Sequence, residues 1–188
     1  MIFRSMPQIF LNNLTPGDTL WVRFWENGNN NFGDFDICIT IPPAPPVNDE
    51  PCNAIPLTPD STCNYLTFSN ENSSATPNVP APGCANYQGG DVWFTVVVPP
   101  SGGLYFDGIQ GVITDGGMAL YTGTCDNLSL LACDDDSSPN GLMPRIRQMG
   151  LTPGDTIWVR YWEYGNDNNG TFGICVTLPP PPPTNDDP

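Results

Sequence analysis

The chain contains an internal repeat, because residues 14–51 recur with few changes at residues 151–188. The offset is constant at 137 residues, and 26 of the 38 aligned positions are identical. The run LTPGDTLWVRFWE in the first copy becomes LTPGDTIWVRYWE in the second. Self-similarity at a fixed period indicates a tandem array. The sequence therefore predicts one complete module preceded by the last part of another, a pattern typical of a stalk or fibre.

The repeat also predicts the domain boundaries. Residues 52–178 form one complete module, which is an ordinary domain size. Proline-rich linkers follow each copy at residues 42–51 and 179–188. Proline fixes φ and favours the extended polyproline II conformation, so we interpret the linkers as semi-rigid spacers. A ligand for an aromatic groove is the alternative interpretation of these tracts.

Residues 1–41 are only the C-terminal third of a preceding module. A segment this short buries too little surface to fold alone. We therefore expect its strands, around Leu20–Phe24 and Phe35–Ile39, to be ordered by pairing with strands from upstream or from a neighbouring copy. Residues 1–7 lack a charged start followed by an apolar run, so we expect an interior piece of an exported protein.

The charge balance limits the function classes. The chain has 20 acidic residues, five basic residues and no histidine, for a net charge of −15. Such a charge repels nucleic acid and anionic membranes, and no run of 18 apolar residues predicts membrane insertion. Without histidine the usual general bases and nucleophile–histidine pairs are missing. We therefore predict that the chain is not an enzyme, although carboxylate pairs leave glycosidase chemistry open.

The complete module contains six of the seven cysteines, because Cys38 belongs to the preceding copy. An even number in one module predicts three disulfides in an oxidising compartment. A zinc site is the competing reading, but the chain has neither a C-x-x-C pair nor histidine. The cysteines of the complete module are Cys52, Cys63, Cys84, Cys125, Cys133 and Cys175, with Cys125–Cys133, Cys63–Cys84 and Cys52–Cys175 as the expected pairs.

Short runs of aromatic and β-branched residues separated by Gly, Pro, Asn and Asp predict an all-β module. No window has a sustained helical period. Seven or eight strands in this length predict a jelly-roll-like β-sandwich. The expected strands are 91–98, 103–107, 117–123, 128–133, 142–149, 156–164 and 171–178, with 64–69 as a further candidate and 70–83 as loop.

The strand at 156–164 alternates strictly. Ile157, Val159 and Tyr161 point to one face and are predicted core residues. Trp158, Arg160 and Trp162 point to the other face, as a guanidinium between two indoles. Exposed indoles stack sugars, so this face is a candidate carbohydrate-binding platform. A face that packs against a loop or the next module is the alternative.

Several runs resemble a known superfamily. They are GDVWFTVVVP at 90–99, DGGMALYTG at 115–123, LACDDD at 131–136 and GLTPGDTIWVRYWEY at 150–164. Together they resemble the bacterial pre-peptidase C-terminal (PPC-like) domains. The version with cysteines and Asn-Asp-x-Pro junctions is similar to tandem modules of secreted Bacteroidetes adhesins. The resemblance covers residues 47–178 and the partial copy before them, and it implies a jelly-roll sandwich, export and a place at the cell surface.

The resemblance also implies a candidate cofactor, because some relatives bind calcium through acidic residues near the linker and the loops. Calcium prefers carboxylate and carbonyl oxygens. No EF-hand loop is present, and the run at 134–141 is equally typical of a solvated hairpin loop. The calcium candidates are Asn48, Asp49, Glu50, Asp91, Asp115, Asp134, Asp135 and Asp136.

These observations predict a structural or adhesive repeat module of a secreted cell-surface fibre or giant adhesin, with neighbouring copies of the module as partners. One alternative is a carbohydrate-binding module that binds surface glycans through Trp158 and Trp162. The other is a self-assembling filament subunit that strands of a neighbouring copy complete.

Overall fold

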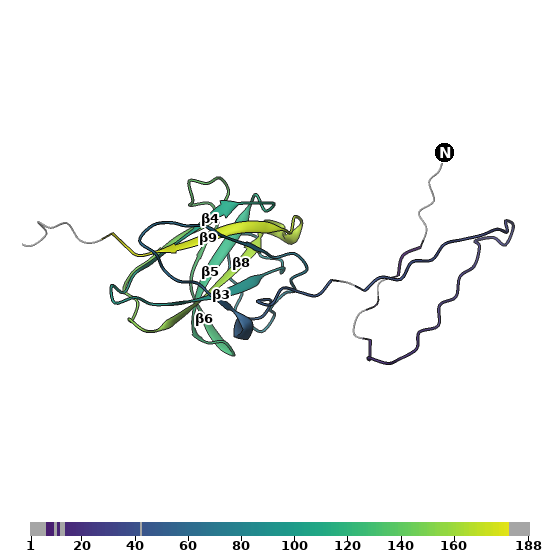
Figure 1. Cartoon of the computed structure of the whole chain (residues 1–188), viewed down its shortest axis with the longest axis horizontal. Coiled ribbons are helices and arrows are strands. Elements are labelled where there is room, and N and C mark those ends of the chain that lie inside the picture. Colours follow the sequence, from purple (N-terminus) through teal and green to yellow (C-terminus); the bar gives the residue numbers. More distant parts are fainter. Residues whose placement is uncertain (1–6, 10, 12–13, 42, 181–188) are drawn as a thin grey trace, which may run out of the picture. The chain divides into compact units, whose positions relative to one another are not determined.

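The computed structural model describes residues 7–9, 11, 14–41 and 43–180 (Figure 1). The chain divides into two compact units, Met1–Ile41 and Pro42–Pro188. Of the linker expected at 179–188, all but the first two residues lie outside the described residues.

The second unit is a β-sandwich of a five-stranded and a four-stranded sheet, with strand orders β1-β3-β8-β5-β6 and β2-β9-β4-β7 (Figure 1). Its strands are β1 (Ile55–Pro56), β2 (Leu66–Ser69), β3 (Val92–Val97), β4 (Leu104–Gln110), β5 (Gly116–Thr124), β6 (Asn127–Asp134), β7 (Arg145–Gln148), β8 (Thr156–Glu163) and β9 (Thr171–Thr177). Two 3₁₀ turns span Pro51–Asn53 and Tyr164–Asn166. The all-β sandwich prediction is confirmed, and each strand expected in residues 52–178 is present. Sequence reasoning missed β1, which is only two residues long.

The last two strands in the chain occupy central positions in the two sheets. β8 is antiparallel to both β3 and β5, and Val159 faces Phe94 on one side and Leu120 on the other. β9 is antiparallel to both β2 and β4, and Ile174 faces Leu66 and Gly108. Since β8 and β9 belong to different sheets, they do not share a ladder. Both sheets therefore depend on the final segment of the module.

The core between the sheets follows the period of two that a strand imposes on its side chains. Ile157, Val159 and Tyr161 of β8 all lie in it, as the alternation predicted. The ring of Tyr161 stacks on that of Phe172 from β9, with centroids 3.8 Å apart and planes 4° apart. This stack links a central strand of one sheet to a central strand of the other.

The other face of the five-stranded sheet is also buried. Trp93, Tyr121 and Trp162 form a second apolar cluster on that side. The segment before β3 covers them, because the Trp162 indole N–H donates to the Ala85 carbonyl at 2.9 Å and the Tyr121 hydroxyl donates to the Pro80 carbonyl at 2.9 Å. The predicted loop at 70–83 is therefore part of a cover over the sheet.

All six cysteines of the complete module form disulfides, but the expected pairs are wrong. Cys125 lies in the turn between β5 and β6, and Cys133 lies near the end of β6. Eight extended residues separate the two by about 26 Å, so a local clip is impossible. Instead, one disulfide fastens the covering segment to β6 and another ties the β1–β2 connection to β9. The observed pairs are Cys52–Cys125, Cys63–Cys175 and Cys84–Cys133.

In the first unit, residues 14–41 form no strand. The strands expected at Leu20–Phe24 and Phe35–Ile39 correspond to β8 and β9, whose hydrogen-bonding partners are β3, β5, β2 and β4. Residues 14–41 contain no counterpart of those four partner strands, so neither segment has a ladder to join. Cys38 is exposed and unpaired. The expectation that strands from elsewhere order this unit stays a prediction.

Candidate functional site

The most elaborate polar arrangement in the described residues surrounds Arg160 in the centre of β8. Arg160 and Asp91 are both fully buried, and the guanidinium Nε lies 3.0 Å from the Asp91 carboxylate. The ring of Tyr87 lies 4.0 Å from the guanidinium carbon and that of Trp93 lies 5.1 Å from it. A buried charge is tolerated only when it is paired and hydrogen-bonded, and this one has both a counter-ion and two aromatic faces.

The Asp91 carboxylate accepts hydrogen bonds on both oxygens. One oxygen accepts from the Trp93 indole N–H at 2.9 Å, from the Thr76 hydroxyl at 2.8 Å and from Arg160. The other accepts from the Tyr87 hydroxyl at 2.6 Å. Burial, followed by the Asp91 hydrogen bond, raises the pKa of Tyr87 well above its ordinary range, so the hydroxyl stays protonated as a donor. Both Asp91 oxygens are therefore hydrogen-bonded inside the fold, and its assignment as a calcium ligand stays a prediction.

The remaining Arg160 donors are also used. One terminal nitrogen donates to the Thr76 carbonyl at 3.2 Å and to the Tyr87 hydroxyl, and the other donates to the Tyr121 hydroxyl at 3.4 Å. The network therefore joins the covering segment, β3, β5 and β8 around one cation. With each of its three nitrogens hydrogen-bonded inside the fold, the role of the Arg160 guanidinium is to hold the cover on the sheet.

The predicted sugar platform is wrong in this module. Arg160 and Trp162 are completely buried, and Trp158 is half-buried. The aromatic rings beside the guanidinium are those of Tyr87 and Trp93, not the two indoles on its own strand. The alternative, a face that packs against a loop, is the observed one. Both faces of β8 are buried, one in the core between the sheets and the other in the second apolar cluster.

Sequence reasoning missed the role of Asp91 and Tyr87. A signal was available, because a lone arginine between two indoles in so acidic a chain requires a buried carboxylate as its counter-ion. The sequence does not say which of 20 acidic residues supplies it. Asp91 lies 69 residues from Arg160, and only the β3–β8 pairing brings the two together.

A separate group of carboxylates lies where β5 begins and β6 ends. One oxygen each of Asp115, Asp135 and Asp136 lies within 4.8 Å of the others. Burial, then the charges of Asp136 and Asp115, raises the pKa of Asp135 to about 6. Burial, then the charge of Asp136, also raises the pKa of Asp115. Asp115 and Asp135 each have one buried oxygen without a hydrogen-bond partner among the described residues. The fold therefore brings together three of the predicted calcium ligands.

The other calcium candidates do not join this group. Asp49 accepts from the Ser74 amide at 2.6 Å and from its hydroxyl at 2.8 Å. Asp134 accepts from the amides of Ser137 and Arg145. In addition, the buried Asn48 side chain donates to the Trp93 carbonyl at 3.0 Å, and burial followed by the charge of Asp49 raises the pKa of Glu50.

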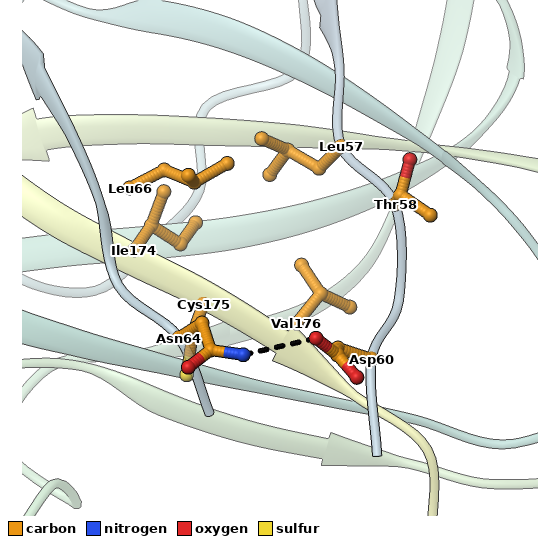
Figure 2. Close-up of a pocket in the computed structure, with 8 residues that line it drawn as sticks. All are labelled: Leu57, Thr58, Asp60, Asn64, Leu66, Ile174, Cys175 and Val176. Atoms are coloured by element: carbon orange, nitrogen blue, oxygen red, sulfur yellow. Dashed lines mark hydrogen bonds between the residues drawn. The ribbon is translucent and has the colours of Figure 1, made fainter. Parts of the chain in front are cut away.

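A small hollow lies beside β9, between the segment that follows β1 and the start of β2. Figure 2 shows Asp60 and Asn64 at one end, where the Asn64 amide donates to the Asp60 carboxylate at 2.9 Å, and apolar side chains such as Leu57 and Ile174 along the rest. Its volume is about 120 Å³, which is below the roughly 300–1,000 Å³ of ligand pockets. In the part of the chain that the structure describes, no helix is long and apolar enough to span a membrane.

Comparison with known proteins gives a weak likeness among solved structures. No protein-family model matches the chain. No curated protein matches it either. Among solved structures, the chain is similar to the pre-peptidase C-terminal domain of collagenase from Bacillus anthracis, with 11% identity and a TM-score of 0.40 over 65% of this chain and 93% of that chain. A likeness at this level carries no argument about activity or ligand.

Proposed function

We propose that this chain is a structural or adhesive repeat module of an extracellular cell-surface fibre or giant adhesin. The observation that carries the proposal is the recurrence, at residues 14–51, of the sequence of β8, β9 and the following proline tract. A chain that repeats the closing strands of a sandwich and then a spacer is suited to modules in series. The length of such an array scales with the number of modules.

The chemistry of the complete module supports a passive role in an oxidising compartment. Three disulfides in a module of this size are typical of exported proteins. The one buried ion pair in the described residues, Arg160 with Asp91, is enclosed by the fold and has a structural role. The net charge of −15 favours mutual repulsion between copies and solubility at a crowded surface.

Immunogold labelling of intact cells with an antibody against residues 52–178 tests the proposal. We expect label at the cell surface or on extracellular fibres, and we expect surface proteolysis to remove it. Deletion of the gene should reduce attachment of the cells to surfaces. Label confined to the cytoplasm, on protein whose cysteines are reduced, would contradict the proposal.

A calcium-stabilised loop is part of this proposal. Asp115, Asp135 and Asp136 offer oxygens at one place, and carboxylates held this close repel one another unless a cation or a proton intervenes. The test is a thermal melt with calcium and with a chelator. We expect calcium to raise Tm in the native protein and to have no effect in Asp135→Asn/Asp136→Asn, while the matched control Asp155→Asn keeps the response.

A filament subunit that neighbouring copies complete is the second candidate. It is favoured by residues 14–41, which match the final strands of the sandwich and pair with no strand among the described residues. The length of the complete gene product discriminates between the two. Many copies of the 137-residue period in one polypeptide support the adhesin, and a single copy in a polypeptide that polymerises supports the filament.

A further inference from the structure

Residues 14–41 hold the aromatic stack of residues 151–178, although the two segments differ in their surroundings. The rings of Phe24 and Phe35 are stacked with centroids 4.0 Å apart and planes 13° apart. The equivalent rings in the complete module, Tyr161 and Phe172, are 3.8 Å apart with planes 4° apart. The stack that joins β8 to β9 is therefore also present in residues 14–41, although neither of the two segments belongs to a sheet there.

The connection between these two segments is also the same in both copies. The Asn30 amide donates to the Glu26 carboxylate at 2.9 Å. The Asp167 amide, 137 positions later, donates to the Glu163 carboxylate at 2.9 Å. Residues 14–41 thus have the local structure of the β8–β9 corner of the sandwich, which lowers the ordering cost of docking.

The faces that are core in the complete module are open to solvent in the first unit. Trp25 is 72% exposed and its equivalent Trp162 is 0% exposed. Ile37 is 57% exposed and its equivalent Ile174 is 0% exposed. A large apolar surface on a locally ordered segment marks an interaction site.

The contacts of β8 and β9 in the complete module indicate what a partner of residues 14–41 must provide. There, β8 and β9 each lie between two other strands, Arg160 pairs with Asp91, and Cys175 is bonded to Cys63. The equivalents of Arg160 and Cys175 in the first unit are Arg23 and Cys38, which are both exposed.

We propose that residues 14–41 dock into a half-module with the chemistry of residues 52–150, whose aspartate at the position of Asp91 pairs with Arg23. The cysteine of that half-module at the position of Cys63 forms a disulfide with Cys38. The two thiols lose two protons and two electrons to a small-molecule or protein disulfide of the oxidising compartment, which is reduced to its thiols.

The complete module itself has no free place for these residues. Its residues 52–150 are already completed by its own residues 151–178. An exchange between identical chains would displace one β8–β9 pair for each pair that docks. The partner is therefore a half-module without β8 and β9 of its own. The inference deepens the proposed function, since it names the partner of the repeat.

A full-length acceptor chain with the substitutions Cys38→Ser, Arg160→Glu and Cys175→Ser tests this inference. The acceptor is reduced, denatured and refolded in a glutathione redox buffer with a peptide of residues 14–41. We expect a Cys38–Cys63 link between peptide and acceptor in the non-reducing peptide map. The same peptide with Arg23→Glu should give at least about tenfold less of it, because a buried arginine–carboxylate pair is lost.

A peptide of residues 151–178 is the positive control and should form the Cys175–Cys63 link. If the control peptide cross-links and the 14–41 peptide does not, the inference is overturned.

The natural protein offers a second test that needs no refolding. Protein isolated from its source with thiols blocked is digested without reduction. We expect the Cys38 peptide to be bonded to a peptide that resembles Asp60–Leu66. Cys38 recovered with the blocking group, or bonded to a cysteine at another position of the repeat, would overturn the inference. Cell-surface labelling tests the proposed function separately, so either can fail without the other.

Discussion

Replacing Asp91 by asparagine should destabilise the module severely, because it leaves the Arg160 charge buried without a counter-ion. Both side chains are fully buried. Breaking one half of a buried pair costs about 3–5 kcal/mol. The asparagine amide also turns an NH₂ group toward the donors of Thr76, Trp93 or Tyr87, which adds about 1 kcal/mol for an unmet donor. Arg160 keeps its neutral acceptors, which offset about as much as the unmet donor adds. We therefore expect a total loss of about 3–5 kcal/mol in the free energy of unfolding.

The double substitution Asp91→Asn/Arg160→Met separates the ion pair from general damage to the fold. Arg160→Met alone leaves a buried carboxylate with only neutral donors. In the double variant no charge is left uncompensated, so its cost should be below the sum of the two single costs by about 1–3 kcal/mol. The side chain of Met fills much of the volume of the arginine stem, which limits the cavity contribution.

Urea denaturation followed by tryptophan fluorescence, with all three disulfides intact, measures these differences. The matched control is Arg147→Met on β7, since Arg147 is exposed and lies 5.4 Å from the Tyr105 ring. It should cost less than about 1 kcal/mol. An Asp91→Asn variant within about 1 kcal/mol of the native protein, or a double variant equal to the sum of the singles, would refute a dominant role for the pair.

Three further outcomes are expected from single sites. Since the pKa of Asp135 is raised from 3.8 to about 6, the folded state holds this proton more tightly than the unfolded chain. The Asp135 carboxyl therefore favours folding at acidic pH, and its contribution to the free energy of unfolding is lost as the pH rises through about 6. Asp135→Asn should flatten this part of the pH–stability profile, measured in the presence of a chelator. Replacing Cys84 and Cys133 by alanine should cost roughly 2–4 kcal/mol in urea denaturation and expose Trp162 to acrylamide quenching. Gly117→Ala would place a Cβ 2.4 Å from the Trp162 ring, so we expect a loss of about 1–3 kcal/mol in the same assay.

The sequence predicted those features that depend on neighbouring residues. Alternation along β8 identified Ile157, Val159 and Tyr161 as core, and the turn residues separated the strands correctly. The even cysteine number in one period predicted three disulfides. Each of these inferences needs only a short window or a count, and each was confirmed.

Features that depend on which strands become neighbours were not predictable. The pairing of Cys84 with Cys133 requires the covering segment to cross the outer face of the five-stranded sheet. The burial of Arg160 requires β8 to be a central strand. The same sequence is compatible with an edge strand that displays its indoles to solvent, so the sequence alone does not decide between the two. Likewise Asp115, 20 residues before Asp135, joins the acidic group only because β5 and β6 pair with each other.

The order of the strands along the chain gives the repeated segment its importance. β8 and β9 come last, yet each lies in the middle of a sheet. Neither sheet is complete until β8 and β9 have joined it, and the proline tract begins directly after them at residue 179. Of the 28 positions in 14–41, 19 are identical to those in 151–178. Residues 151–178 contact both sheets, the buried Asp91 carboxylate and Cys63, and these contacts restrict which side chains the segment can carry. If the modules stand in series as proposed, closure of one module by its final strands lets it finish folding before the next begins.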